Sequence, residues 1–397
     1  MISVDEALAR IFSLVPAPEA ETVSLAEAAG RVLAAPLTAA HSQPPFDASA
    51  MDGYAVRAGD VIAGRSLRLI GTAQAGQRFS GMMGPGQCVR IFTGAPLPIG
   101  ADTVIIQEEA TANGAQISFA AQPIMGQCIR QRGSAFAEGE ALLAAGTLLT
   151  PARLTLAAAA NRARLTVARR PRVALLATGD ELVVPGTALG PDQIVASNSY
   201  GLAPLFAPAS AEVVNLGIVP DDLGGLTARL HEVLATGIDV LVTTGGASVG
   251  DRDYMREALA ALGVSLDFWK IAIRPGKPLM FGRHGKTLIF GLPGNPVSAI
   301  VTGAVVVLPA LRHWAGQADP LGIRLRLPLA APLPANGDRR HFIRARLEPA
   351  PGGTRVMPFG QTDSGQVALL AAADGLLIQP ENDAGLPAGA AVDFMPL

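Results

Sequence analysis

The chain has 397 residues, a length that predicts two to four domains, because a typical domain has about 100 to 200 residues. Hydrophobic residues make up 49% and charged residues 16% of the chain, which suits sizeable cores and excludes an intrinsically disordered protein. The 31 basic and 33 acidic residues nearly balance, so we expect no nucleic-acid partner. The two cysteines lie far apart, so we expect no zinc site, no disulfide scaffold and a reducing, cytoplasmic location.

The N-terminal segment predicts an amphipathic helix. Ser3 and Glu6 form a capping-box pattern, and apolar residues follow at three- and four-residue spacing between positions 4 and 15. Acidic residues interrupt the apolar stretch that a secretory signal needs, so we expect no export signal. Ser24 and Glu27 repeat the capping pattern and predict a second, shorter helix.

Short β-type runs separated by glycine and proline occupy residues 46–145 and predict a β-rich inserted domain. Beyond them, Thr150 and Pro151 are typical of a helix start, and an alanine-rich helix should reach about residue 161. We therefore expect residues 1–45 and 146–170 to form one helical linker domain, which the insert interrupts.

Apolar strands alternate with amphipathic helices between residues 171 and 318. This order is typical of a doubly wound, mostly parallel sheet, in which ligands bind at the carboxyl ends of the strands. The longest apolar run, residues 297–311, is shorter than the roughly 18 to 20 residues of a membrane span, so we expect a buried helix and no membrane partner. Residues 319–397 return to β-like runs and predict a small barrel-like domain, so the predicted fold is multidomain α/β plus β.

The strongest local motif is TTGGASVGDRD at residues 243–253, between a predicted strand and a predicted helix. Gly245, Gly246 and Gly250 allow backbone amides to approach a ligand closely, and Ser248 adds a hydroxyl, so we interpret the segment as a phosphate cradle. The segment lacks the Walker and dinucleotide-binding patterns. An ordinary strand-to-helix turn would explain some of the glycines, but not their combination with two aspartates.

Carboxylates follow two other strands of the predicted sheet. Asp180 and Glu181 come directly after one strand, and Asp221 and Asp222 come after the next. Such groups suit a hydrated magnesium ion that also binds phosphate oxygens. Each aspartate taken alone could equally well be a helix cap. The metal site is favoured over capping only because the predicted sheet places these carboxylates at one edge.

A basic segment and a rigid loop complete this set. The segment WKIAIRPGKP carries Lys270, Arg274 and Lys277, and the only other lysine of the chain is Lys286. Grouped cations suit an oxyanion or a polyphosphate, whereas the alternative is an ordinary solvated surface. The loop GLPGNPVS at residues 291–298 is either one wall of a ligand site or simply a well-built helix start.

Two segments of the insert, at residues 46–57 and 92–105, place polar side chains among turn residues. Asp52 and Thr93 are the candidate ligands there, and turn chemistry alone explains the neighbouring glycines. The five histidines of the chain show no metal-binding spacing, so we assign them no catalytic role.

Six motifs occur in one order along the chain: SAMDGYAV, TGAPLPIGADTVI, TGDEL, TTGGASVG, RPGKP and GLPGNPVSA. In this order the chain resembles, over nearly its whole length, the molybdopterin molybdenumtransferases, the MoeA family that includes the E-domain of gephyrin. The resemblance implies a Mg²⁺-dependent transferase that acts as an elongated homodimer. It also implies that the enzyme inserts molybdate into adenylylated molybdopterin and releases AMP and molybdenum cofactor, with the preceding adenylyltransferase as a further candidate partner.

The functional positions of the family map onto this chain through these motifs. The resemblance implies catalytic roles for Asp52, Thr93, Asp222, Asp253, Lys270, Arg274 and Lys277. It implies metal binding by Glu181, Asp222 and Asp253. It implies a role for Pro293 and Pro296 in the rigid loop, and for Arg344 and Ser364, which match positions linked to molybdate. We expect cofactor binding by these four residues and by Thr178, Gly179, Asp180, Gly245, Gly246, Ser248, Gly250, Gly294 and Asn295.

One stretch departs from the family pattern. The family usually has Gly-Glu-Asp where this chain reads Gly133-Ser134-Ala135, so two carboxylates are missing. This difference leaves open a noncatalytic cofactor-binding scaffold. A second alternative is the adenylyltransferase that acts one step earlier and resembles the central α/β domain alone. Molybdate and tungstate are tetrahedral dianions of nearly equal size, so both stay open as substrates.

Overall fold

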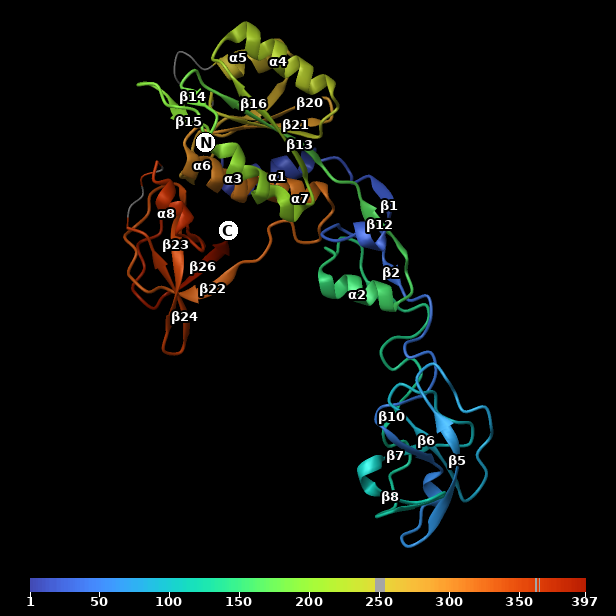
Figure 1. Cartoon of the computed structure of the whole chain (residues 1–397). Helices are drawn as coiled ribbons and strands as arrows, with labels where there is room; N and C mark the ends of the chain where they lie inside the picture. Colours follow the sequence, from blue (N-terminus) through green and yellow to red (C-terminus); the bar gives the residue numbers. More distant parts are fainter. Residues whose placement is uncertain (247–253, 361–362, 364) are drawn as a thin grey trace.

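The structure is a computed structural model of the chain, and it describes residues 1–246, 254–360, 363 and 365–397. Figure 1 shows an elongated molecule. An α/β module and a C-terminal β module lie together at one end, and the β-rich insert lies at the far end of an arm formed by the chain segments on either side of it.

The α/β module is built on a six-stranded sheet in the order β16-β13-β17-β21-β20-β18. The first four strands pair in parallel, whereas β20 pairs antiparallel with both of its neighbours. The sheet is therefore mixed, with five strands pointing one way and β20 the other. The strands are β13 (Arg172–Thr178), β16 (Glu212–Val219), β17 (Val240–Thr244), β18 (Ser265–Phe268), β20 (Met280–His284) and β21 (Thr287–Leu292).

Helices cover both faces of this sheet (Figure 1). Because the strands between them are buried on both sides, they read as continuous apolar runs, as the sequence predicts. One face is covered by α1 (Val4–Leu14), α3 (Asn198–Phe206), α6 (Pro296–Thr302) and α7 (Leu308–Trp314), and the other by α4 (Leu223–Ala235) and α5 (Tyr254–Ala261).

Helix α1 packs on the α/β module, although it lies within residues 1–45, which we predict to be part of the linker domain. The Ser3 hydroxyl accepts the Glu6 amide at 3.0 Å, as the capping pattern predicts. The apolar side of α1, which includes Leu8 and Ile11, is buried against the α/β sheet. On its polar side, Asp5 accepts two hydrogen bonds from Arg340 of the C-terminal module, at 2.7 and 2.8 Å. Helix α1 therefore joins two other modules, because its apolar stripe matches their core.

The apolar run at residues 297–311 lies in a single long helix. Helix α6, a π-helical stretch at Gly303–Val307 and α7 run without a break from Pro296 to Trp314. Within the described ranges, this helix is long and apolar enough to cross a membrane, but 83% of its apolar window is buried inside the protein. The prediction of a buried helix is confirmed.

The linker pairs segments from the two sides of the insert. Strands β1 (Ala20–Ser24) and β12 (Arg164–Ala168) form one pair, and β2 (Leu37–Thr38) and β11 (Ala141–Leu143) form another, beside α2 (Pro151–Ala159). The predicted helix after Ser24 is only a 3-10 turn, Leu25–Glu27, although its capping box is formed.

Arg169 fixes the linker to the α/β module. Its guanidinium donates to both carboxylate oxygens of Asp239, at 2.8 and 2.9 Å, and lies 4.7 Å from the ring centre of Trp314. A planar guanidinium with two parallel hydrogen bonds and a stacked ring has few ways to rotate. This contact therefore sets the direction in which the arm leaves the sheet.

The insert contains a second six-stranded sheet, in the order β7-β4-β6-β5-β9-β8, with apolar clusters of its own. Most regular elements between residues 46 and 145 are strands. The amides of Gly133 and Ala135 donate to Pro44 and Gln43 at 2.9 Å, so this departure from the family pattern lies where the insert meets the linker. The six strands of this sheet are β4 (Gly53–Val56), β5 (Ser66–Ala73), β6 (Gln87–Ile91), β7 (Thr103–Ile106), β8 (Ala110–Asn113) and β9 (Gln116–Phe119). A separate two-stranded sheet consists of β3 (Ala48–Ser49) and β10 (Ile129–Arg130).

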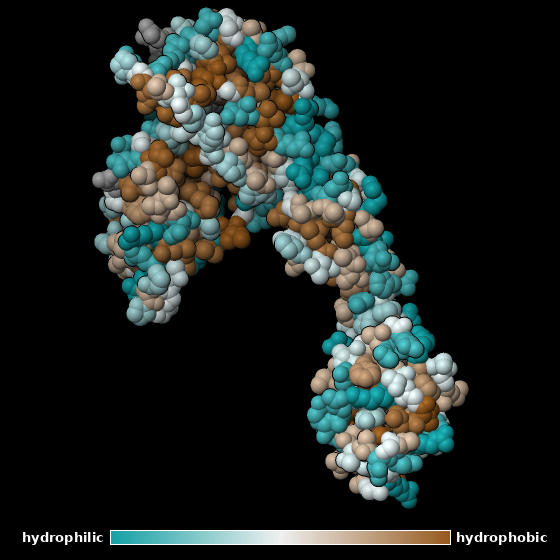
Figure 2. All heavy atoms as spheres, in the orientation of Figure 1, coloured by the Kyte–Doolittle hydropathy of each residue, from teal (hydrophilic) through white to brown (hydrophobic). Residues whose placement is uncertain are grey.

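The C-terminal module is a sheet in the order β19-β23-β25-β26-β22, and β24 pairs with the second half of β23 on the side opposite β25. A bridge between Leu329 and Val356 links the end of β22 to β24, so the pairings nearly close around an apolar core. Figure 2 shows apolar surface beside the hollow between this module and the α/β module. The elements are β19 (Ile273–Arg274), β22 (Leu325–Pro328), β23 (Arg340–Ala350), β24 (Gly353–Pro358), α8 (Val367–Ala371), β25 (Gly375–Gln379) and β26 (Ala391–Pro396).

The buried side chain of His341 in β23 makes this module sensitive to acid. Burial, followed by the charges of Arg274, Arg339 and Arg344, lowers the pKa of His341 from 6.5 to about 4. A folded pKa below the unfolded value contributes stability above pH 6.5, and that stability is lost as the pH falls from 6.5 towards 4. We expect the free energy of unfolding to fall by about 3 kcal/mol across this pH window.

Denaturant unfolding at several pH values measures this effect. His341→Gln is expected to lose most of the pH dependence, because glutamine does not titrate. An equal pH dependence in the wild type and the variant would assign the acid sensitivity to other groups.

Candidate active site at the edge of the α/β sheet

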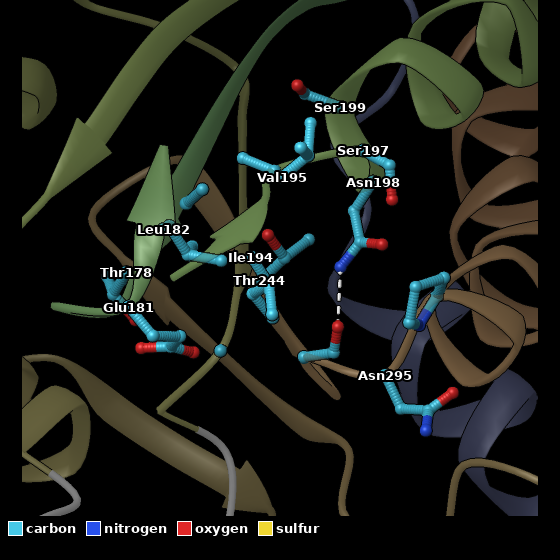
Figure 3. A pocket seen from close by; sticks show the side chains of 15 residues that line it. Thr178, Glu181, Leu182, Ile194, Val195, Ser197, Asn198, Ser199, Thr244 and Asn295 are labelled. Atoms are coloured by element: carbon cyan, nitrogen blue, oxygen red, sulfur yellow. Dashed lines mark hydrogen bonds between the residues drawn. The ribbon is translucent and has the colours of Figure 1, made fainter. Parts of the chain in front are cut away.

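Three adjacent strands of the sheet, β13, β17 and β21, end side by side at Thr178, Thr244 and Leu292. A cavity of about 320 Å³ opens at this edge (Figure 3). Segments from four parts of the chain line it, including Glu181, the start of α3 and the loop before α6. Of the predicted site residues, six line this cavity: Thr178, Glu181, Gly245, Gly294, Asn295 and Pro296.

Gly245 forms the tightest point of this edge. Its φ is +92°, and a Cβ there would lie 2.4 Å from the carbonyl oxygen of Thr178. Gly246 continues the turn with φ of +61°. Only glycine fits such a backbone, so the sequence motif reflects a geometric need. The other motif residues Ser248, Gly250 and Asp253 lie outside the described residues.

Asn198 at the start of α3 fastens the Pro293–Pro296 loop. Its Nδ2 donates to the carbonyl oxygen of Gly294 at 2.8 Å, a bond that Figure 3 shows across the cavity wall. Asn295 occupies the N-cap position of α6, but its side chain makes no capping hydrogen bond. We did not predict Asn198, because its partner is 96 residues away and no local pattern marks it.

The carboxylates at this edge divide into two kinds. Asp222 caps α4, since its Oδ2 accepts the Gly225 amide at 2.6 Å. The Asp180 carboxylate accepts the Asp221 amide at 3.0 Å. Burial raises the pKa of Asp221, and the negative charges of Asp180 and Glu181 raise it further. Asp180, Glu181 and Asp221 therefore concentrate negative charge beside the cavity, while Asp222 has a structural partner.

This charge distribution fits a magnesium ion. Among the described residues, no three groups form a ready-made metal shell. Mg²⁺ commonly uses only one or two carboxylates and completes its shell with water and phosphate oxygens. A cation beside Asp221 would offset the repulsion that raises the pKa of this carboxyl.

The basic segment links the sheet edge to the C-terminal module. Strand β19 pairs in parallel with β23, which places Arg274 opposite His341. The Ile271 amide donates to the Lys277 carbonyl at 3.2 Å, so the turn between them brings Lys270 close to Lys277 along the backbone. Arg274 and Arg344 both lower the pKa of His341, so each of the two predicted molybdate-binding arginines lies near His341.

Arg344 has a role that the sequence did not predict. Its buried guanidinium donates to the backbone carbonyls of Asp363 and Gln366, at 3.0 and 2.9 Å. It therefore holds the loop that carries position 364. Ser364 itself lies outside the described residues.

Asp52 and Thr93 form a pair in the insert, away from the sheet edge. The Asp52 Oδ1 accepts hydrogen bonds from both the amide and the hydroxyl of Thr93, each at 2.7 Å. Arg90 donates to Gly53 O at 2.7 Å, and its guanidinium carbon lies 5.1 Å from the ring centre of Tyr54 and 4.8 Å from that of Phe92. Figure 1 places the insert at the opposite end of the arm, so one chain alone does not bring this pair to the cavity.

Thr93→Val is expected to raise the pKa of Asp52. The Thr93 amide and then the Thr93 hydroxyl are the main causes that lower this pKa, and the charge of Arg90 adds to them. Valine keeps the shape and the amide but lacks the hydroxyl, so the shift should be partial. A carboxyl NMR titration of wild type, Thr93→Val and Thr93→Ser measures it. An unchanged pKa in Thr93→Val would contradict the role of the hydroxyl.

The fold and the cavity define a multidomain protein with a ligand site at the carboxyl edge of an α/β sheet. Family descriptions match three consecutive regions: the MoeA N-terminal region (domains I and II) at residues 2–161, a probable molybdopterin binding domain at 174–313, and the MoeA C-terminal region (domain IV) at 326–397. The chain belongs to the MoeA family.

Relatives of known name resemble the chain over its full length. A molybdopterin molybdenumtransferase from Nostoc is 35% identical, with 98% of this chain and 92% of that protein covered. Molybdopterin molybdenumtransferase 2 of Mycobacterium tuberculosis is 38% identical, with 98% of each chain covered. The crystal structure of a molybdopterin biosynthesis MoeA protein from Pyrococcus horikoshii superposes with a TM-score of 0.86 at 27% identity and covers 100% of both chains.

Proposed function

We propose that this chain is a transferase of molybdenum cofactor biosynthesis, which inserts molybdenum from molybdate into adenylylated molybdopterin and releases AMP. The observation that carries the proposal is the cavity at the sheet edge. There the Gly245 turn, the Glu181 carboxylate after β13 and residues 294–296 of the loop before α6 surround one space. The names of full-length relatives support the same activity.

In this proposal the turn at Gly245 and Gly246 holds the substrate phosphate. Neither residue has a Cβ, so the backbone can approach an anion closely. Thr178 lies in one wall of the cavity, and residues Gly294, Asn295 and Pro296 lie in another. The bond from Asn198 to Gly294 keeps that loop in place before the ligand arrives.

We propose that Glu181 and Asp221, supported by Asp180, hold Mg²⁺. When bound, the metal neutralises charge at the phosphoanhydride as it breaks. Asp222 keeps α4 and the turn before it in position through its cap. Asp253 remains a proposed ligand on the ground of the family resemblance.

Lys270, Arg274 and Lys277 are the proposed receptors of molybdate. A tetrahedral dianion needs several cationic donors, and these three come from one short turn. Arg344 acts as a positioning residue, because its hydrogen bonds order the loop of Ser364. Ser364 then supplies a hydroxyl to the oxyanion.

The proposed enzyme is a homodimer that works in the cytoplasm. The Asp52–Thr93 pair is built as a site but lies far from the cavity of its own chain. A second copy would bring such a pair to the cavity and complete the catalytic set.

We further propose the domain bounds 1–45 with 146–170, 46–145, 171–318 and 319–397, with α1 packed on the α/β module. The preceding adenylyltransferase is the proposed supplier of the substrate.

One assay tests the function. The purified chain is incubated with adenylylated molybdopterin, Mg²⁺ and molybdate, and AMP release and cofactor formation are measured together. We expect both products, and we expect chelation of Mg²⁺ to stop them. Cofactor binding without AMP release would identify a carrier, and ATP-dependent adenylylation of molybdopterin would identify the adenylyltransferase; either result overturns the proposal. A tungstate arm measures the metal preference.

A further inference from the structure

Trp269 is the exposed one of the two tryptophans in the chain. Its exposed fraction is 41%, whereas Trp314 is buried. Trp269 directly follows β18, which pairs antiparallel with β20, and β20 pairs antiparallel with β21. Strand β18 therefore runs in the direction of β21 and ends at the same edge as the cavity. An exposed indole thus lies at the same edge of the sheet as the proposed active site, two strands from β21.

Two cations share this indole. The guanidinium carbon of Arg256, in the first turn of α5, lies 4.3 Å from the ring centre, and the Lys270 ammonium lies 4.1 Å from it. The two positive charges are therefore no more than about 8.4 Å apart, which is close to one Debye length at physiological ionic strength. The ring attracts each cation, but the cations repel one another.

Neither cation has a carboxylate partner within the part of the chain that the structure describes. Arg229 of α4, by contrast, pairs with Glu232 at 3.0 Å. Arg256 is exposed and Lys270 is partly exposed, so both can reach a ligand. Two unpaired like charges on one aromatic platform, at the edge of a ligand site, match a multiply charged anion that binds both.

We propose that Arg256, Trp269 and Lys270 form an oxyanion-binding platform that receives a phosphate or molybdate group at the entrance of the active site. The inference rests on the proposed function for Lys270 and adds Arg256 as a second anion-binding residue, with Trp269 as the residue that positions both. Both cations lie within 4.3 Å of the same ring centre, so an anion that reaches both is attracted by two positive charges. No covalent step takes place there.

Tryptophan fluorescence tests the proposal on the full chain. The wild type is titrated with molybdate and, separately, with AMP, at constant ionic strength set by chloride. We expect a saturable change in emission, because the anion alters the field of the cations beside the ring. Trp269→Phe should remove the change, which assigns the signal to Trp269 and not to Trp314. Saturation by molybdate alone identifies the incoming oxyanion as the ligand, and saturation by AMP alone identifies the substrate phosphate.

Matched variants separate this site from general electrostatics. Arg256→Gln should weaken anion binding by about fivefold to tenfold, and Arg256→Lys should keep most of it. Arg283→Gln removes the same charge from an exposed position on β20, next to the start of β18 and thus at the opposite edge, and should bind anions as the wild type does.

Two results overturn the inference: no saturable response to either anion, or equal affinity in Arg256→Gln and wild type. The AMP-release assay reports separately on the proposed function. Normal cofactor formation by Arg256→Gln at low substrate concentration would reject the platform and leave the transferase in place. Saturable anion binding by a protein that lacks transferase activity would support the platform and reject the proposed function.

Discussion

Gly245→Ala is expected to reduce AMP release by about 100-fold or more, because a displacement of about 1 Å at a reacting group costs that much. Its backbone has φ of +92°, and the new methyl group would lie 2.4 Å from Thr178 O and 3.0 Å from Thr178 Oγ1. Real Cβ atoms do not approach carbonyl oxygens so closely, so the turn or the end of β13 has to move. Both elements line the cavity, and the proposed phosphate site would move with them.

Gly237→Ala is the matched control for this prediction. Gly237 follows α4, has φ of +68°, and has open space where a Cβ would be placed. It carries the same cost of a left-handed backbone, about 1 to 2 kcal/mol, without the clash. We expect a lower melting temperature and near-normal AMP release. If Gly245→Ala retained full activity with a similar loss of stability, the turn would have no role at the phosphate.

The sheet edge could be predicted from the sequence because it follows from periodicity and order. Buried parallel strands read as apolar runs, and the residues directly after them must gather at one edge. The structure places Thr178, Thr244 and the Pro293–Pro296 loop around one cavity for this reason. Gly245 could be predicted as well, because a turn with positive φ favours glycine, and a glycine is visible in the sequence.

Contacts between distant segments left no such mark. Asn198 holds Gly294 and α1 packs on the α/β core, but polar and apolar side chains of this kind have many equivalent partners in a sequence. The same reason applies to Asp52 and Thr93. The motifs indicate that both residues matter, and only the three-dimensional arrangement shows that they form a pair at the far end of the arm.

The neighbouring residues Asp221 and Asp222 are chemically identical in the sequence, and the family resemblance selects Asp222 as catalytic. In the structure the Asp222 carboxylate accepts a hydrogen bond from the Gly225 amide and so caps α4. Asp221 lies among other carboxylates, and its raised pKa records their repulsion. Which of two adjacent aspartates turns towards the helix depends on backbone geometry, and residue type carries no information about it.

Asp221→Asn is accordingly expected to lower Mg²⁺-dependent AMP release by about 100-fold, since it removes a proposed metal ligand. At neutral pH the variant should be at least as stable as the wild type. A carboxyl whose folded pKa is raised loses stability as the pH rises through that pKa, and the amide escapes this loss. The increase in melting temperature that Mg²⁺ gives the wild type should shrink in the variant.

Asp222→Asn is the matched comparison, because asparagine caps a helix about as well as aspartate does. It should keep most of the activity, while Asp222→Ala should destabilise the protein by about 1 kcal/mol through the lost cap. Thermal unfolding with and without Mg²⁺, together with AMP release, measures all three variants. An inactive Asp222→Asn beside an active Asp221→Asn would return the metal to Asp222 and make the cap seen here the arrangement that Mg²⁺ replaces.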